Sequence, residues 1–415
     1  MPSRREMLKT TVALPAAAVF GAATAGAQTG PRVAVIGAGA FGGWTALELV
    51  RRGARVTLVD AWGPGHARAS SGGETRVIRA TYGTRSLYTT MALRAIELWR
   101  AHDARFERRF FHQTGALWLF GQDDSFGRAS AAVLRAAKQP LEELSPADAR
   151  TRYPQIAFDG ITSVLVEPNA GLLLARRACE HVAERVVAEG GAYRQAAIAS
   201  PVKLSGGAVK SVALEGGGSL DADAFVFACG PWLGALFPDV VGASVTPTRQ
   251  DVFYFGTPPG DTRFNEDTLP VWVDFGERLI YGLPGNANRG FKVADDTPGP
   301  PFDPTSGSRE ASAAGLKAMR AFLARRFPAL AKAPLIGTEV CQYEASPDSH
   351  FIIDRHPAAP NAWIVGGGSG HGYKMGPALG ELVASCVLGT GTPDPTFALA
   401  RFKKPPAGPG QEKWS

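Results

Sequence analysis

The sequence contains few cysteines and histidines, and it lacks the patterns that usually mark metal or hydrolytic sites. The four cysteines lie far apart, without a CxxC pair: Cys179, Cys229, Cys341 and Cys386. That spacing argues against a zinc ribbon, a thioredoxin motif or a disulfide scaffold, and leaves individual disulfides open. The seven histidines have no metal-ligand spacing, and HExxH, Walker A and nucleophile-elbow motifs are absent. We therefore expect no metal site.

The charge is not strongly biased to one sign. Lys and Arg number 44 against 38 Asp and Glu, giving a net charge of +6, and they are scattered among the acids, so nucleic-acid binding is not expected. Apart from a candidate at the N-terminus, no run approaches the roughly 20 apolar residues that cross a bilayer, and membrane insertion is not expected. The 415 residues, 45% of them hydrophobic, have the composition of a globular protein of two or three domains.

Residues 1–27 are typical of an export signal. A basic head with Arg4 and Arg5 precedes an Ala-rich stretch and an A-x-A cleavage pattern that ends at Ala27. The head, SRREMLK, resembles the twin-arginine signal, with Met7 where Phe is usual. A short disordered tail or a helical anchor is the alternative. We expect recognition by the twin-arginine export machinery, cleavage after Ala27 and a periplasmic location.

A strand–turn–helix–strand unit opens the rest of the chain. Residues 32–36 (RVAVI) form an apolar run expected as a buried strand, residues 40–52 have helical periodicity, and residues 55–59 form a second strand. A G-x-G-x-x-G motif joins the first strand to the helix, which is the context that a dinucleotide-binding fold requires.

The motif residues each have a physical task. Gly37 permits the tight turn, Gly39 lets the backbone approach a pyrophosphate, and Gly42 lets the helix pack closely on the strand. The N-terminus of the helix offers free N–H groups to phosphates. Asp60 ends the second strand, where a carboxylate can bind ribose hydroxyls. This unit alone leaves FAD and NAD open.

Three further blocks point to flavin. They are SSGGETRVIRATY at 70–82, CQYEASPDSHFIID at 341–354 and GGGSGHGYK at 366–374. In this order the blocks resemble the D-amino-acid-oxidase-like flavoenzymes, and within them the branch of monomeric sarcosine oxidase, N-methyltryptophan oxidase and pipecolate oxidase. The resemblance covers most of the chain after residue 30 and is specific for the family, not for a substrate.

The resemblance implies an α/β fold with a Rossmann-type FAD-binding domain and an inserted mixed-sheet α+β substrate domain. Strand-like runs at 110–121, 249–256 and 270–284, and helical patterns at 172–190 and 315–327, are compatible with it. We assign the FAD-binding domain to residues 31–108, 160–238 and 336–402, the substrate domain to 109–159 and 239–335, and a tail to 403–415.

Cys341 stands in the C-x-Y motif where the resembling enzymes carry a thioether link to the flavin 8α carbon. The resemblance therefore implies covalent FAD, and the reactivity of a thiolate fits this role. The alternative is a small buried apolar residue, the usual state of a free cysteine. We interpret Cys179, Cys229 and Cys386 in that second way, as core residues.

The loop at 366–374 implies a site for flavin and substrate. The resemblance assigns cofactor contacts to this loop and a substrate-carboxylate clamp to two cations, Lys374 and Arg79, although a lone surface cation is usually solvated. His371 and Lys374 would add positive potential at the flavin, whose reduced form is an anion. The cofactor-binding glycines of the loop are Gly368, Gly370 and Gly372.

Other positions carry over in the same way. Thr75 and Arg76 match residues beside the flavin ring, and Tyr343 is expected among the substrate-binding residues. Lys292 matches the oxygen-activating lysine, whose ammonium would stabilise the superoxide formed when reduced flavin transfers an electron to O2. An exposed strand lysine is the alternative. The expected catalytic set is Lys292, Arg76, Lys374 and His371.

Two departures place the substrate in doubt. Sarcosine-type enzymes commonly carry His where this chain has Gly72, and an aromatic residue and a His where it has Asp295 and Asp296. The pocket is therefore not expected to be that of a sarcosine oxidase. One hypothesis is that Asp296 binds a second cationic group of the substrate.

The resemblance implies a monomeric FAD-dependent amine oxidase. It would transfer a hydride from the α-carbon of a secondary amino acid, N-methyl or cyclic, to the flavin. O2 would reoxidise the flavin to give H2O2, and the imine would hydrolyse. Two alternatives stay open: a periplasmic D-amino-acid dehydrogenase that passes electrons to a membrane acceptor, and a flavin-bearing binding protein without catalysis.

Overall fold

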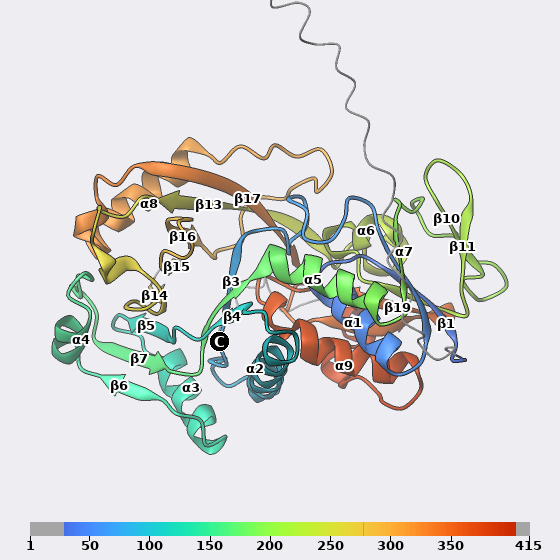
Figure 1. Ribbon diagram of the computed structural model, residues 1–415, viewed down its shortest axis with the longest axis horizontal. Helices are drawn as coiled ribbons and strands as arrows, with labels where there is room; N and C mark the ends of the chain where they lie inside the picture. Colours follow the sequence, from blue (N-terminus) through green and yellow to red (C-terminus); the bar gives the residue numbers. More distant parts are fainter. Residues whose placement is uncertain (1–28, 277, 404–415) are drawn as a thin grey trace, which may run out of the picture.

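The protein is described by a computed structural model that covers residues 29–276 and 278–403. The predicted export signal and residues 404–415 of the predicted tail lie outside this range. Two large sheets lie towards opposite ends of the molecule. The long strands β13 (Thr246–Phe255) and β17 (Leu335–Ala345) belong to one of these sheets and extend towards the other (Figure 1). No helix in the described part of the chain is long and apolar enough to cross a membrane.

A mostly parallel six-stranded sheet forms one end. Its order is β18 (Ile352–His356), β19 (Ala359–Gly366), β12 (Ala224–Phe227), β1 (Arg32–Ile36), β2 (Arg55–Asp60) and β9 (Ala192–Gln195). Only β18, at one edge, pairs in the antiparallel direction. In the central strand β1 all residues except the first are buried, as expected for a strand covered on both faces.

Helices cover one face of this sheet, and shorter segments cover the other. Val33 and Val35 share a hydrophobic cluster with α1 (Ala40–Arg51), α5 (Ala175–Ala188) and α9 (Gly376–Val387). Ala34 and Ile36 point to the opposite cluster, because side chains alternate along a strand. That second cluster includes residues of α6 (Leu233–Leu236) and α7 (Pro238–Val241).

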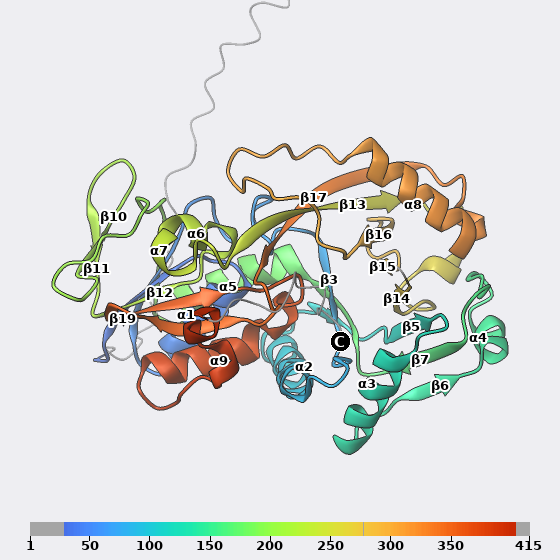
Figure 2. The same cartoon turned by 180° about the vertical axis from the view of Figure 1, so that it is seen from behind.

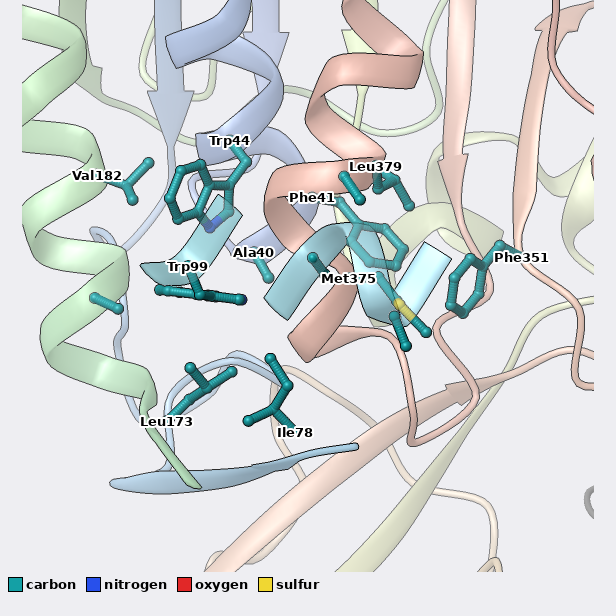
Figure 3. Packing of buried hydrophobic residues seen from close by; sticks show 14 of the residues in the cluster. Ala40, Phe41, Trp44, Ile78, Trp99, Leu173, Val182, Phe351, Met375 and Leu379 are labelled. Atoms are coloured by element: carbon teal, nitrogen blue, oxygen red, sulfur yellow. The ribbon is translucent and has the colours of Figure 1, made fainter. Parts of the chain in front are cut away.

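Aromatic side chains fill the space beneath α1. Trp44 packs edge-on against Trp99 of α2 (Ser86–Phe106) with ring centroids 5.0 Å apart, and Phe41 packs against Phe351 at 5.5 Å (Figure 3). Each fully buried large apolar side chain contributes about 1.5–3 kcal/mol. Gly380 of α9 lets α9 approach α1 closely, since a Cβ on Gly380 would lie 2.8 Å from the backbone of Trp44 in α1. The packing holds the N-terminus of α1 in a fixed position at the end of β1.

An eight-stranded sheet forms the other end. Its order is β17, β13, β16 (Phe291–Asp295), β15 (Leu279–Leu283), β14 (Val271–Phe275), β5 (Ala116–Phe120), β7 (Ser163–Glu167) and β6 (Glu142–Leu144). All neighbours are antiparallel except β5 and β14. The helix α8 (Ala313–Arg326) lies along β13 and β17 (Figure 2).

Smaller elements complete the described chain. A three-stranded sheet of β3 (Thr75–Ile78), β8 (Gly171–Leu174) and β4 (Phe111–His112) lies between the two large sheets, and β10 (Ser211–Ala213) pairs with β11 (Ser219–Asp221). The other α-helices are α3 (Ser125–Ala136) and α4 (Pro146–Arg152). The 3₁₀ helices are η1 (Gly230–Trp232), η2 (Thr262–Phe264), η3 (Pro328–Leu330), η4 (Tyr373–Met375), η5 (Pro395–Phe397) and η6 (Leu399–Lys403).

The fold confirms the predicted α/β class and the Rossmann-type unit, while some element boundaries differ. The helix expected from residue 172 begins at Ala175, because residues 171–174 pair with β3 as strand β8. The strand-like run at 270–284 is a hairpin of β14 and β15. Strands β7 and β17, assigned to the FAD-binding domain, are hydrogen-bonded in the eight-stranded sheet. The domain boundaries themselves stay a prediction.

Candidate active site

The turn after β1 is shaped for a phosphate-bearing ligand. Gly37 has a φ of 104°, in the region that glycine tolerates best, and its N–H donates to the Val59 carbonyl at 2.7 Å. A Cβ on Gly42 would lie 1.8 Å from the Gly37 carbonyl oxygen, so only glycine lets α1 pack this closely. The Asp60 carboxylate accepts a 2.8 Å hydrogen bond from the Ala38 N–H. The glycine motif and Asp60 are therefore joined by hydrogen bonds at the end of the two strands.

A cavity of about 390 Å³ begins at this turn. Its lining includes Gly37, Gly39 and Asp60 of this turn and also the glycines of the predicted flavin loop, Gly368, Gly370 and Gly372. Two of its lining residues have buried polar atoms without a hydrogen-bond partner among the described residues: Ser70 Oγ and Glu344 Oε2. A glycine cradle and orphaned polar atoms in the wall fit an extended dinucleotide such as FAD.

A second, smaller cavity of about 70 Å³ adjoins the first. Both cavities are lined by Arg76, Tyr343, Gly370 and Tyr373. Further residues that line the second cavity are Arg79, Trp118, Tyr281, Asp296, Cys341, His371 and Lys374. This arrangement brings most of the predicted substrate and catalytic residues together beside the flavin end of the large cavity.

The two predicted clamp cations share one tyrosine. Arg79 and Lys374 are both buried, with exposed fractions of 5% and 4%. The Arg79 guanidinium lies 4.4 Å from the centroid of the Tyr82 ring, and Lys374 Nζ donates to the Tyr82 hydroxyl at 3.0 Å. Burial lowers the pKa of Arg79, because a charge is costly away from water. The energetic cost falls when an anion binds between such cations.

His371 continues this chain of hydrogen bonds. Its Nε2 lies 2.9 Å from the Ser349 carbonyl oxygen, and its Nδ1 lies 3.3 Å from the Tyr82 hydroxyl. A carbonyl can only accept, so Nε2 carries the proton and Nδ1 accepts from Tyr82. Burial raises the pKa of Tyr82, which keeps its donor proton in place. Lys374, Tyr82 and His371 thus form one directed hydrogen-bond chain.

Lys292 is a buried strand residue, not an exposed one. It lies in β16 with an exposed fraction of 2%, and its Nζ donates to the Thr75 carbonyl oxygen at 2.8 Å. Burial and the nearby Arg76 charge lower the pKa of Lys292 to about 7. Thr75 and Arg76 begin strand β3. The carbonyl of Thr75, which is predicted to lie beside the flavin, therefore positions Lys292, the lysine predicted to activate oxygen.

Arg76 lies against Cys341. The guanidinium Nη2 is 3.4 Å from Cys341 Sγ and also donates to the Ser70 carbonyl. A cation therefore lies directly beside the cysteine that is predicted to bind the flavin. All four cysteines are free. Cys179 and Cys386 are buried, as expected, whereas Cys229 packs on a hydrophobic cluster and also lines the large cavity.

The two acids after Lys292 point in different directions. The Tyr343 hydroxyl donates to Asp296 Oδ1 at 2.6 Å, and Asp296 lines the small cavity. Asp295, one position earlier on the strand, is ion-paired with Arg278. Of the pair, Asp296 is therefore the one that faces the site. The structure also explains Gly72: a Cβ there would lie 1.9 Å from the His66 carbonyl oxygen, so no side chain fits.

Residues 32–386 match the family described as "DAO: FAD dependent oxidoreductase". The chain belongs to this family. Among curated relatives, it is 29% identical to monomeric sarcosine oxidase of Bacillus sp. (strain B-0618), over 90% of this chain and 96% of that protein. It is 29% identical to N-methyl-L-tryptophan oxidase of Salmonella heidelberg (strain SL476), over 89% of this chain and 97% of that protein. It is 26% identical to peroxisomal sarcosine oxidase of Homo sapiens, over 89% of this chain and 94% of that protein.

Solved structures share the fold of this DAO-family chain. L-proline dehydrogenase from P. horikoshii aligns with a TM-score of 0.79 at 20% identity, covering 90% of this chain and 98% of that one. Fructosamine oxidase (Amadoriase II) from Aspergillus fumigatus aligns with a TM-score of 0.75 at 22% identity, covering 89% of each chain. The protein is an FAD-dependent oxidoreductase, and the fit of its large cavity to FAD agrees with this membership.

Tyr82 and Glu167 belong to the DAO-family site and were not predicted. Tyr82 closes the 70–82 block, but its contact with Lys374 joins positions far apart in sequence. Glu167 is fully buried behind Arg79, and it accepts hydrogen bonds from the N–H groups of Ala80 and Thr81. Burial raises the pKa of Glu167. Glu167 lies outside the motif blocks, and the role of both residues depends on contacts with residues far away in the sequence.

Proposed function

We propose that this FAD-dependent oxidoreductase is an amine oxidase acting on a secondary α-amino acid, either N-methyl or cyclic. The observation that carries the proposal is the pair of buried cations, Arg79 and Lys374, at a small cavity that shares its wall with the cofactor cavity. Two cations whose N–H groups are already positioned by neighbouring residues can form charge-assisted hydrogen bonds with the two oxygens of a carboxylate. The names of the curated relatives, sarcosine oxidase and N-methyl-L-tryptophan oxidase, support the amine class.

The chain's own residues would bind and orient the reactants. Arg79 and Lys374 hold the substrate carboxylate, and this fixes the α-carbon beside the shared wall, a positioning on which the rate depends. The chain from Lys374 through Tyr82 to His371 keeps the ammonium aimed into the cavity. When bound, FAD supplies the hydride acceptor and passes the electrons to O2, giving H2O2 and an imine that hydrolyses.

We assign the cofactor contacts as follows. The glycine turn and Asp60 hold the nucleotide end, and Thr75, Arg76 and the glycine loop hold the flavin end. Cys341 would carry the thioether link to the flavin, a role supported by its position beside Arg76 in the wall of the small cavity. Lys292 supplies positive charge for reaction with O2. We further propose that the enzyme is monomeric.

The pocket would select its substrate through Asp296. This acid lies in the same small cavity as the two cations and is held by Tyr343. A substrate with a carboxylate at one end and a second cationic group at the other would match both charges. We propose such a cationic secondary amino acid as the preferred substrate.

Export by the twin-arginine machinery to the periplasm belongs to the same proposal. It is supported by the basic head and the A-x-A pattern of residues 1–27. Cell fractionation of the native host tests it: we expect a chain that starts after Ala27 in the periplasmic fraction. A full-length, uncleaved chain in the cytosol would contradict it.

Anaerobic mixing of the holoenzyme with N-methyl, cyclic and primary D-amino acids tests the function. We expect the flavin absorbance to bleach with a secondary amino acid, and one H2O2 per substrate consumed in air. Bleaching with little peroxide would favour a dehydrogenase that uses another acceptor. No bleaching with any amine would contradict an enzymatic role.

A matched pair of substrates tests the clamp. The wild type is expected to use a carboxylate substrate with a kcat/KM about 10- to 150-fold above that of its carboxamide, as one charge-assisted hydrogen bond is worth about 1.5–3 kcal/mol. Lys374→Met should remove most of this preference. Lys332→Met, an exposed lysine, serves as the control. Equal kcat/KM values of the wild type for the carboxylate and the carboxamide would contradict the proposal that Arg79 and Lys374 bind the substrate carboxylate.

A further inference from the structure

A buried acid in the wall of the cofactor cavity has no part in the mechanism above. Glu344 lies on β17, one position after Tyr343, and has an exposed fraction of 7%. Because side chains alternate along a strand, Glu344 points away from the substrate side and lines the large cavity only. Asp60, another acid in this wall, belongs to the glycine turn, whereas Glu344 lies beside Gly366 and Gly368 of the predicted flavin loop.

Backbone lies against one side of the carboxyl group. The N–H groups of Gly367 and Gly368 are placed so that they favour its ionised form. Glycine is needed around it, because a Cβ on Gly366 would lie 3.0 Å from Glu344 Oε2, and one on Gly368 would lie 3.0 Å from Oε1. The loop and the acid therefore fit each other closely, which fixes the direction in which the carboxyl points.

The other side of the carboxyl group is incomplete. Glu344 Oε2 is buried and has no hydrogen-bond partner among the described residues. Buried polar atoms are nearly always hydrogen-bonded, so an orphaned oxygen in the wall of a ligand cavity indicates that the ligand supplies the partner. The family membership identifies that ligand as FAD.

The surroundings of Glu344 contain little charge. The loop at 366–368 contributes glycines, and η1 contributes Gly230 and, at its N-cap, the partly buried thiol of Cys229. On β17 itself, Tyr343 faces the other side and is hydrogen-bonded to Asp296. No cation among the described residues acts on the carboxyl group, and burial raises the pKa of Glu344 to about 7 against the opposing effect of the Gly367 and Gly368 N–H groups.

We propose that Glu344 is a ligand for the flavin half of FAD, with Oε2 hydrogen-bonded directly to the cofactor. The inference rests on FAD binding, which the family establishes, and not on the identity of the amine substrate. Its consequence is electrostatic. The reduced flavin is an anion, so an ionised Glu344 opposes reduction and a protonated Glu344 favours it. Reduction of the flavin therefore draws one proton from solvent onto Glu344 when the pH is near neutral.

The test compares Glu344→Gln with the wild-type holoenzyme, reduced by light or dithionite so that no amine is needed. In the wild type we expect a pH-dependent shift of the flavin absorption spectrum near neutral pH, and its loss in the variant. The wild-type midpoint potential should become more negative than that of the variant as the pH rises. One extra proton per two electrons steepens the slope by about 30 mV per pH unit, which is a tenfold change in the equilibrium constant.

Glu215→Gln is the matched control, because Glu215 is an exposed acid of the same cavity. It should leave the spectrum and the potential unchanged. Identical pH profiles of spectrum and potential in Glu344→Gln and the wild type would overturn the proposal. A folded Glu344→Gln chain, judged by circular dichroism, that binds FAD more weakly would support it.

A measurement on the wild type alone covers the case in which the variant does not fold. The reduced-minus-oxidised infrared spectrum of the holoenzyme, with glutamate carboxyl groups labelled by ¹³C, reports directly on carboxyl protonation. A glutamate band that changes with flavin reduction, and does so most near neutral pH, supports the proposal. The absence of any such band would overturn it.

Discussion

The Tyr343 hydroxyl donates a 2.6 Å hydrogen bond to Asp296, and both side chains are buried in the wall of the small cavity. The two residues come from β17 and from the end of the β16 hairpin, which lie on opposite sides of β13 in the sheet. The bond therefore links the strand that carries the predicted flavin-linked cysteine to the acid proposed to select the substrate.

Removing the charge of Asp296 should change selectivity more than stability. For Asp296→Asn we expect kcat/KM for a cationic N-methyl amino acid to fall about 10- to 100-fold, while that for a neutral one changes little, because one charge-assisted contact is lost. Asp295→Asn is the control, since Asp295 is ion-paired with Arg278. Equal turnover of both substrates by wild type and Asp296→Asn would contradict the proposal.

The hydrogen-bond chain through Tyr82 should matter for substrate binding. Tyr82→Phe keeps the ring that Arg79 contacts and removes one acceptor of the Lys374 ammonium, which also donates to the His371 carbonyl. We expect KM for the carboxylate substrate to rise about three- to tenfold, from the loss of about 0.5–1.5 kcal/mol. Steady-state kinetics check this. Tyr193→Phe, whose hydroxyl has no hydrogen-bond partner among the described residues, should leave KM unchanged.

Reaction with O2 should depend on the protonation of Lys292. Its pKa is lowered to about 7, so the ammonium fraction falls as the pH rises through that value. The rate constant of flavin reoxidation should fall over the same pH range, and in Lys292→Met it should be about 100- to 1,000-fold lower and independent of pH there. Stopped-flow oxidation of the reduced enzyme measures it, with the exposed Lys317→Met as control. A normal rate in Lys292→Met would remove its assigned role.

The same lysine should make folding stability depend on pH. An unfolded lysine titrates near 10.4, whereas the buried one titrates near 7, so between these values the unfolded chain binds more protons. Stability from this group therefore rises as the pH increases from about 7 to about 10. Urea unfolding of the wild type and of Lys292→Met across this range tests it, and the rise should be missing in the variant.

Covalent attachment of FAD has a direct assay. After acid precipitation, we expect the flavin absorbance to stay with the unfolded wild-type pellet, because a thioether survives denaturation. Cys341→Ser should release the flavin into the supernatant, while Cys386→Ser, a buried core position, should behave like the wild type. Flavin in the wild-type supernatant would contradict the link.

The parts predicted from sequence were those that depend on short-range patterns. The glycine turn, Asp60 and the strands around them follow from spacing alone, and the motif blocks located Arg79, Lys374 and Cys341 at one cavity. Residues that act across the fold were missed. Glu167 lies outside the motif blocks and Glu344 lies inside one, but neither could be assigned a role because their partners come from distant strands and loops. The helix predicted from residue 172 begins at Ala175 in the structure, because the apolar residues 172–174 are equally compatible with a strand and form part of β8.

The long strand β17 divides its work between its two faces. Cys341 and Tyr343 face the small cavity, whereas Gln342 donates to the Arg68 carbonyl and Glu344 faces the cofactor cavity alone. A single insertion upstream in the strand would exchange the two faces, so it would turn Glu344 towards the small cavity and Cys341 and Tyr343 away from it.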